Sequence, residues 1–144
     1  SILNAGMEIN QARKKLETGG VQSLAAFGID IETLLRQVGI RIGEELSFSM
    51  KDINGDVEYL NEMMDWWEYS GLGKLTYDID PVFHIEVHLD EKLSDESLPL
   101  WALDDGIIEG AIMSRYESRD GIEVVRILGG PSNDFHSRYE IIMS

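Results

Sequence analysis

The apolar residues of this chain follow a helical spacing in its first half and an extended spacing after that. Before Gly73, apolar positions recur every three or four residues, which predicts helices. Two short helices are expected within residues 1–30, as an N-terminal extension. Asp30 stands where an N-cap belongs, and we expect the long helix after it to be the central helix of the fold. The apolar positions of this helix are Ile31, Leu34, Leu35, Val38, Ile42 and Leu46. A turn is expected at Asp52–Asp56. The apolar positions of the next helix are Val57, Leu60, Met64 and Trp67.

Beyond Gly73 the period changes from about 3.6 residues to about 2, which predicts strands. Two alternating segments meet at a tight turn, Asp80-Pro81, and fit an antiparallel pair. An acidic loop at Asp90–Ser97 leads to a further helix with apolar residues from Leu100 to Ile112, and two more strands follow. We therefore expect one domain spanning residues 1–144 with an α+β fold, a four-stranded antiparallel sheet with helices packed on one face. The four predicted strands cover Leu75–Ile79, Phe83–Leu89, Ile122–Leu128 and Phe135–Met143.

Two helices carry a pair of glycines four residues apart. Gly39 and Gly43 lie in the predicted central helix, and Gly106 and Gly110 lie in the helix between the strands. A glycine inside a helix costs roughly 0.5 to 1 kcal/mol relative to alanine, so each pair indicates that something approaches closely. That neighbour is either another backbone or a ligand. We therefore expect the missing side chains at these four positions to create space inside the fold for something other than the fold's own atoms.

Composition excludes several classes of function. With 12 Lys and Arg against 27 Asp and Glu, the chain has a formal net charge of -15, which opposes binding to nucleic acid or to an anionic membrane. It has no cysteine, so disulfides, cysteine-ligated metals and a thiol nucleophile are excluded. The start of the chain lacks a signal-peptide pattern, and no apolar segment of the sequence is long enough to span a membrane. We expect a cytoplasmic protein without a cofactor.

Histidines are the sharpest candidates for chemistry. His84 and His88 share one face of a predicted strand, and His136 falls on the polar face of the last strand. If the two strands were neighbours, these side chains and Glu86 would be candidate ligands for a metal ion. Same-face residues are about 6.6 Å apart along a strand, too far for one ion to bridge without curvature or a partner subunit. The alternative is a solvated sheet face.

Methionine and tryptophan gather on the second predicted helix. Met63, Met64, Trp66 and Trp67 would suit a pocket for a flat or oily ligand, or they form ordinary core. The acidic residues Asp104, Asp105 and Glu109 would suit an acidic catalytic group, but the usual role of such a cluster is the solvated side of an amphipathic helix.

The glycine-paired helices and the closing segment Asn133–Ile141 resemble the 4-vinyl reductase domain family and the related transport-protein-particle subunits of vesicle tethering. The resemblance runs from about Leu34 to Met143, and Asp134 and Tyr139 match the family's closing pattern. The family's cysteine positions fall on Ser137 and Gly129, so a metal or thiol function tied to them is not expected.

The resemblance implies a domain with an apolar cavity, often dimeric, that binds a small hydrophobic, hydrocarbon-like molecule. We therefore expect a non-enzymatic, cytoplasmic homodimer. The ligand would lie between the glycine-paired helices and the sheet. Two alternatives stay open: an assembly module whose glycine faces pack against a partner chain, and a metalloenzyme using the three histidines. The residues expected to line the cavity are Met63, Met64, Trp67, Phe83, Leu103 and Ile107.

Overall fold

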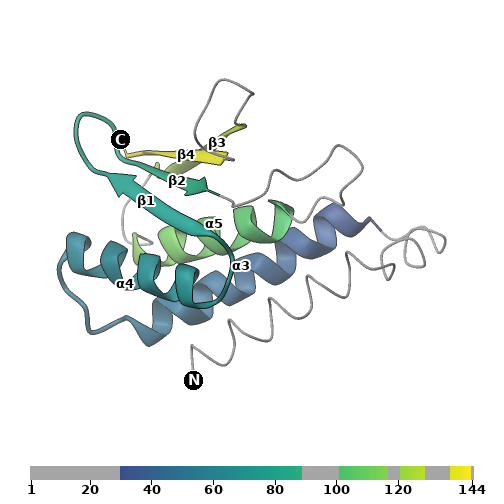
Figure 1. Cartoon of the computed structure of the whole chain (residues 1–144), viewed down its shortest axis with the longest axis horizontal. Coiled ribbons are helices and arrows are strands. Elements are labelled where there is room, and N and C mark those ends of the chain that lie inside the picture. The colour runs from purple at the N-terminus through teal and green to yellow at the C-terminus, as the bar shows by residue number, and fades with distance from the viewer. Residues whose placement is uncertain (1–29, 89–100, 117–120, 129–136, 144) are drawn as a thin grey trace.

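The computed structural model of this chain describes residues 30–88, 101–116, 121–128 and 137–143. The two short helices predicted before Asp30 and the acidic loop at Asp90–Ser97 lie outside these residues. In chain order the described elements are α3 (Ile31–Ser49), α4 (Asp56–Tyr69), β1 (Lys74–Asp78), β2 (His84–His88), α5 (Trp101–Arg115), β3 (Glu123–Leu128) and β4 (Ser137–Ile142), labelled in Figure 1.

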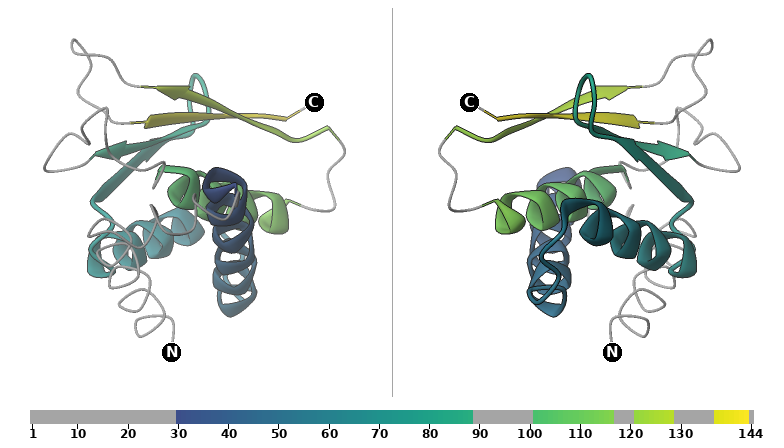
Figure 2. Two further views of the ribbon diagram at one scale, coloured as in Figure 1. Left: turned by 90° about the vertical axis from the view of Figure 1, so that its right-hand side faces the viewer. Right: turned by 90° about the vertical axis from the view of Figure 1, so that its left-hand side faces the viewer.

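The four strands form one antiparallel sheet in the order β1-β2-β4-β3. Figure 2 shows the helices gathered on one side of it. Leu75, Ile85 and Tyr139 are buried on that side, as the alternation along the strands requires. The predicted α+β class, with a four-stranded antiparallel sheet covered on one face, is therefore confirmed.

The helix in the middle of the fold is α5, where we had predicted the helix after Asp30. Asp30 does cap α3, since its side chain accepts a hydrogen bond from the Thr33 amide at 3.2 Å. The hydrogen bonds from Thr33 also hold the pKa of Asp30 below its usual value. In both figures, however, α5 lies next to the sheet and α3 lies on its far side. The outer side of α3 is accordingly open, and Leu34 and Val38 are each 44% exposed.

The two glycine pairs face each other across the contact of α3 with α5. A Cβ atom at Gly39 would lie 2.9 Å from the Gly106 Cα atom, and one at Gly106 would lie 2.9 Å from the Gly39 Cα atom. A Cβ atom at Gly43 would lie 2.6 Å from the Ala111 amide nitrogen. The close neighbour of each glycine is thus backbone of this same chain. The interpretation that the glycines leave room for foreign atoms is wrong, and so is the idea that they face a partner chain.

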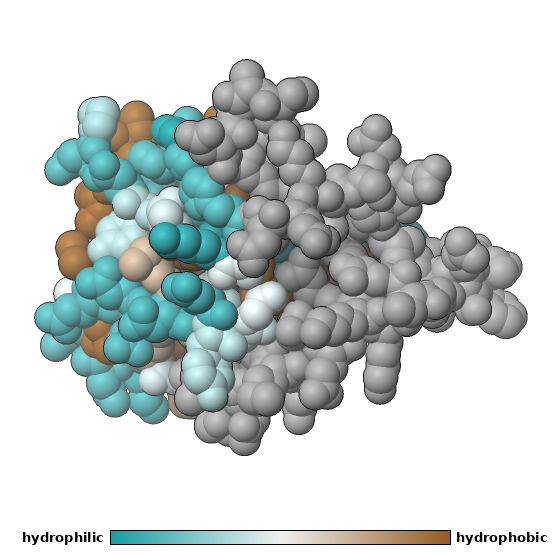
Figure 3. Space-filling model, viewed as in Figure 1, coloured by the Kyte–Doolittle hydropathy of each residue, from teal (hydrophilic) through white to brown (hydrophobic). Residues whose placement is uncertain are grey.

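Polar residues predominate on the described part of one face of the molecule. Figure 3 shows hydrophilic residues over much of the described part of this face, with hydrophobic residues in separate patches. On α4 the buried side falls on Tyr59, Leu60, Met63, Trp66 and Trp67, whereas Val57 is 51% exposed. The predicted apolar stripe included Val57, which is exposed, and left out Tyr59, which is buried. The true buried side is therefore rotated around the helix axis by part of a turn.

Candidate functional site

A groove runs along the contact of α3 with α5, between two rows of side chains. Arg36, Ile40, Glu44 and Phe48 are spaced by four along α3 and so lie in one row on its surface. Asp105, Glu109 and Met113 form the matching row on α5. The glycines bring the two helix axes close, and the rows stand on one side of that contact. We call the space between the rows the interhelix groove; its α3 wall is about 18 Å long at about 1.5 Å per residue.

Three adjoining hollows follow this groove. The arginine-end hollow measures about 240 Å³, the middle hollow about 330 Å³ and the tyrosine-end hollow about 320 Å³. Glu109 lines both of the first two, and Glu44 and Ser114 line both of the last two. The hollows are therefore neighbours in one elongated depression. Apolar groups line its middle and its far end, namely Ile40, Met113, Phe48 and Met50.

At the arginine end, two guanidinium groups share one buried carboxylate. Asp105 is 3% exposed, and its Oδ2 atom accepts hydrogen bonds from Arg36 at 3.0 Å and from Arg126 at 2.6 Å. The Tyr139 hydroxyl donates to Oδ1 of the same carboxylate. The guanidinium of Arg126 also stacks on the Trp101 ring, 3.9 Å from its centroid. This cluster connects α3, α5, β3 and β4 through a single acidic side chain.

Burial sets the protonation of the tyrosine in this cluster. Loss of hydration raises the pKa of Tyr139 well above its ordinary value, and the negative charge of Asp105 raises it further. The phenol therefore remains a hydrogen-bond donor to Asp105 at higher pH than an exposed tyrosine would. A strongly shifted pKa beside paired charges is frequent at functional sites, although structural ion pairs produce it too.

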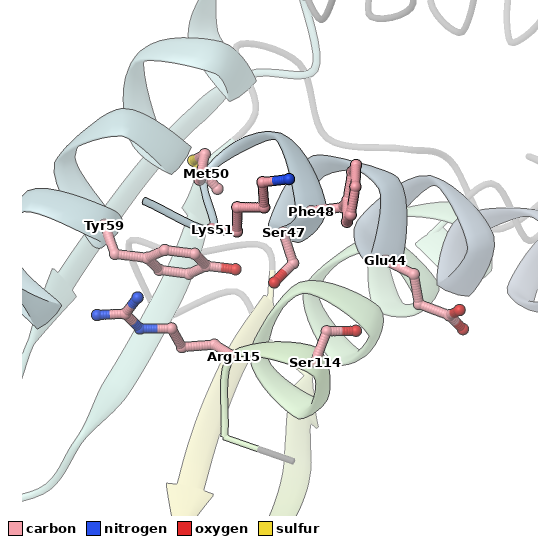
Figure 4. A pocket seen from close by; sticks show the side chains of 8 residues that line it. All are labelled: Glu44, Ser47, Phe48, Met50, Lys51, Tyr59, Ser114 and Arg115. Carbon is pink, nitrogen blue, oxygen red and sulfur yellow. The ribbon is translucent and has the colours of Figure 1, made fainter. Parts of the chain in front are cut away.

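Figure 4 shows the tyrosine end, where α3, α4 and α5 meet. The Tyr59 hydroxyl donates to the Ala111 carbonyl at 2.7 Å, and it points toward the Ser47 hydroxyl. Burial raises the pKa of Tyr59, while the hydrogen bond with Ser47 and the charge of Arg115 act in the opposite direction. Lys51 lies over the Phe48 ring, 4.3 Å from its centroid, at the rim of this hollow.

Arg115 fixes the loop between α3 and α4 beside this hollow. Its guanidinium lies 4.6 Å from the centroid of the Tyr59 ring and donates to the carbonyls of Ile53 and Asn54. It also contacts the Asp56 carboxylate at 3.4 Å, and Asp56 accepts a further hydrogen bond from Tyr116 at 2.9 Å. Burial, followed by the bond to Asp56, raises the pKa of Tyr116 to about 12.

The residues predicted to line an apolar cavity lie elsewhere. Met63, Trp67 and Ile107 are 0% exposed and Leu103 is 4% exposed, within the hydrophobic core. Met64 and Phe83 are partly buried and pack against that core. The three hollows of the groove are lined by other side chains. Lining of a ligand cavity by these six residues therefore stays a prediction.

The strands that carry the predicted histidine site are neighbours, since His84 pairs with Glu140 and Glu86 pairs with Arg138. The described side chains there bind one another: the His84 ring lies 3.8 Å from Glu86, and Arg138 lies 3.6 Å from Glu86 and 3.3 Å from Glu140. The His88 ring lies 3.0 Å from the Thr76 hydroxyl. Within the described part of the chain, no three His, Cys, Asp or Glu side chains are grouped to hold a metal ion. His136 lies outside that part.

The acidic residues of α5 behave differently from the sequence prediction. Asp104 and Asp105 are 2% and 3% exposed, so they are not the solvated side of an amphipathic helix. They are buried because α5 lies between the sheet and α3. Only Glu109 is open to solvent, with its side chain 41% exposed.

The sequence analysis also missed Arg36, Tyr59 and Arg126, which together mark the two ends of the groove. One signal was present for Arg126. It shares one face of β3 with Val124, which packs against the core, whereas Ile127 on the other face is 39% exposed; an inward arginine requires a buried anion. For Arg36 and Tyr59 the spacing along the chain offered no comparable signal.

No described helix combines the length and the apolar composition that a membrane span requires.

Comparison with known proteins does not place the chain in a family. No protein-family model matches this chain, and no curated protein or solved structure is significantly similar to it. The resemblance to the 4-vinyl reductase domain family therefore stays a prediction, and the function is argued from the groove.

Proposed function

We propose that this chain is a non-enzymatic domain that binds a small, largely hydrophobic molecule in the interhelix groove. The observation that carries the proposal is the run of three adjoining hollows along α3 and α5. Ligand sites are concave, mostly apolar and supplied with a few placed polar groups. The groove offers Ile40, Met113 and Phe48 for apolar contact, and the hydroxyls of Ser47 and Ser114 for orientation.

The groove is a better site for such a ligand than the core, where the sequence analysis had located the cavity. Protein interiors are packed as densely as organic crystals, and a ligand inside one needs space that side chains leave free. The glycine positions that would have created this space are occupied by the facing helix backbone. The three hollows lie beside the glycine contact, between the side chains that extend from the two closely packed helices.

A neutral fluorescent probe tests the proposal. Phenylnaphthylamine, an apolar amine that carries a naphthyl and a phenyl group, should bind the full chain with a fluorescence increase and shift amide resonances along the groove. Ser114 stands between two of the hollows, so Ser114→Trp should fill the groove and weaken binding about tenfold or more. Ser49→Trp is the matched control, because Ser49 is an exposed residue at the end of α3 whose side chain lines none of the three hollows.

Two results would contradict the proposal. One is a wild-type protein that fails to bind the probe and releases no hydrophobic molecule into an organic extract after denaturation. The other is a Ser114→Trp variant that folds and binds the probe as tightly as Ser49→Trp does.

A homodimer is a second, separate proposal, supported by the open side of α3. Leu34 and Val38 are one helical turn apart and each 44% exposed, which forms a small apolar strip away from the groove. Val38→Glu should shift a dimer to monomer in sedimentation velocity. Val57→Glu, at an exposed position of α4, should leave the association unchanged. A wild-type protein that is monomeric at high concentration excludes this proposal.

A further inference from the structure

We infer that the ligand of the interhelix groove is an organic acid, whose anionic group binds Arg36 and Arg126 at the arginine end while its apolar body lies along the groove. This inference rests on the proposed function and adds the class of ligand. It comes from the way in which the two guanidinium groups are arranged.

Both guanidinium groups are held in place by Asp105. A guanidinium carries several N–H donors in a rigid plane. Arg36 and Arg126 each give one of them to the same Asp105 oxygen, at 3.0 and 2.6 Å. Within the described part of the chain, the further partners are Glu109, at 3.6 Å from Arg36, and the Trp101 face against Arg126. As far as the described residues are concerned, N–H donors therefore remain on the two arginines that line this hollow.

The two guanidinium groups are held close together at this end. Two positive groups share one buried carboxylate oxygen, so they lie close to each other, and like charges so placed repel. Glu109 offsets only part of this, because its side chain is 41% exposed and it reaches Arg36 alone. A carboxylate or sulfonate bridging the two guanidiniums would relieve the repulsion and form charge-assisted hydrogen bonds.

Negative charge at this end opposes a second anion. Asp105 and Glu109 lie beside the two arginines, the charge of buried Asp104 also acts on this cluster, and the chain has a net charge of -15. The side chain of Arg126 is only 18% exposed, which reduces screening by water of its attraction to a bound anion. Direct hydrogen bonds to both guanidinium groups are therefore what favours an anion against this repulsion.

A matched pair of probes separates this inference from the proposed function. Anilinonaphthalene sulfonate has the ring system of phenylnaphthylamine with an added sulfonate. The full-length chain should bind the sulfonate about tenfold more tightly than the neutral probe, and added salt should reduce that difference. Arg36→Gln should abolish the difference while leaving the neutral probe bound. Arg41→Gln is the control, because it removes the same charge from an exposed position of α3 whose side chain lines none of the three hollows.

Each outcome is decisive. Equal affinity for the two probes, or an unchanged preference in Arg36→Gln, would overturn the inference and leave the proposed function intact. Binding of neither probe, by a protein that also releases no hydrophobic molecule on denaturation, would overturn the proposed function itself. Should Arg36→Gln fail to fold, side-chain NMR of the wild-type protein decides. The arginine Nε–H signals of Arg36 and Arg126 should shift with the sulfonate and stay in place with the neutral probe, and unshifted signals with both bound probes would reject the inference.

Discussion

The two ends of the interhelix groove use opposite means of holding charged side chains. At the arginine end, charged side chains bind one another, with Asp105 accepting from two arginines and a tyrosine. At the tyrosine end, Arg115 and Tyr59 donate mainly to backbone carbonyls. A backbone carbonyl remains neutral when its partner is removed, whereas a buried charge is left uncompensated. The arginine end should therefore be far more sensitive to substitution.

The direction of the helices also distinguishes the two ends, in the sign of the charge that each end favours. Gly39 faces Gly106 and Gly43 faces Gly110, so α3 and α5 run side by side in the same direction. Their N-terminal halves meet at the arginine end and their C-terminal ends meet at the tyrosine end. Helix dipoles favour anions at the first and cations at the second. Arg115, the last residue of α5, and Lys51, just after α3, follow this rule at the tyrosine end, whereas Asp105 lies beyond the first turn of α5 and is held by its hydrogen bonds to Arg36 and Arg126.

The largest effect is expected from removing the shared carboxylate. Asp105→Ala leaves two guanidinium groups and a buried phenol without their acceptor, which should cost about 3–5 kcal/mol of unfolding free energy. Urea denaturation followed by circular dichroism measures this. Glu109→Gln is the control, since Glu109 is a more exposed partner of Arg36 at 3.6 Å and its loss should cost less than about 1 kcal/mol. Equal losses in the two variants would remove the distinction between the ends.

The next effect tests the contact that joins the two ends. In Gly43→Ala, the added methyl group would lie 2.6 Å from the Ala111 amide nitrogen, so the helices must separate. Overpacking of this kind should cost about 3 kcal/mol. Gly55→Ser is the control, because the nearest atoms to a Cβ there are Glu58 side-chain atoms at 3.6 Å and serine is a favoured N-cap residue. A Gly43→Ala protein as stable as the wild type would mean that the helices do not pack through these glycines.

Much of the fold could be predicted from the sequence because its periods are clear. The helical stripe after Asp30 and the alternation after Gly73 correspond to α3 and to the β1–β2 pair. The position of α5 was missed because one of its buried sides consists of glycines. Gly106 and Gly110 bury that side by lacking a side chain, so hydrophobicity alone does not reveal it. With that side unseen, Asp104 and Asp105 were assigned to solvent, and the arginine end of the groove could not be predicted.

A smaller effect is expected at the tyrosine end. Arg115→Met keeps an unbranched side chain against the Tyr59 ring but loses the hydrogen bonds to the Ile53 and Asn54 carbonyls. Water can solvate carbonyls of this exposed loop, so the loss should be about 1.5–2 kcal/mol, well below that of Asp105→Ala. The urea midpoint of the two variants gives the comparison. A larger loss in Arg115→Met would reverse the ranking of the ends.

Alkaline pH gives the smallest effect and tests both ends in one experiment. Burial raises the pKa of Tyr139 and of Tyr59 above the ordinary 10.0, so the unfolded chain loses these protons first. Their contribution to stability is complete below about pH 10 and is lost as pH rises through the folded pKa values, by at most about 1.4 kcal/mol per pH unit for each tyrosine. Asp105 adds its charge at the arginine end, so Tyr139→Phe should flatten the decline more than Tyr59→Phe does. Other groups titrate in the same range, but they contribute equally to both variants, and the difference between the two slopes isolates the tyrosines. Urea midpoints measured from pH 9 to pH 11 with equal slopes in the two variants would show that the charged end imposes no extra constraint on its tyrosine.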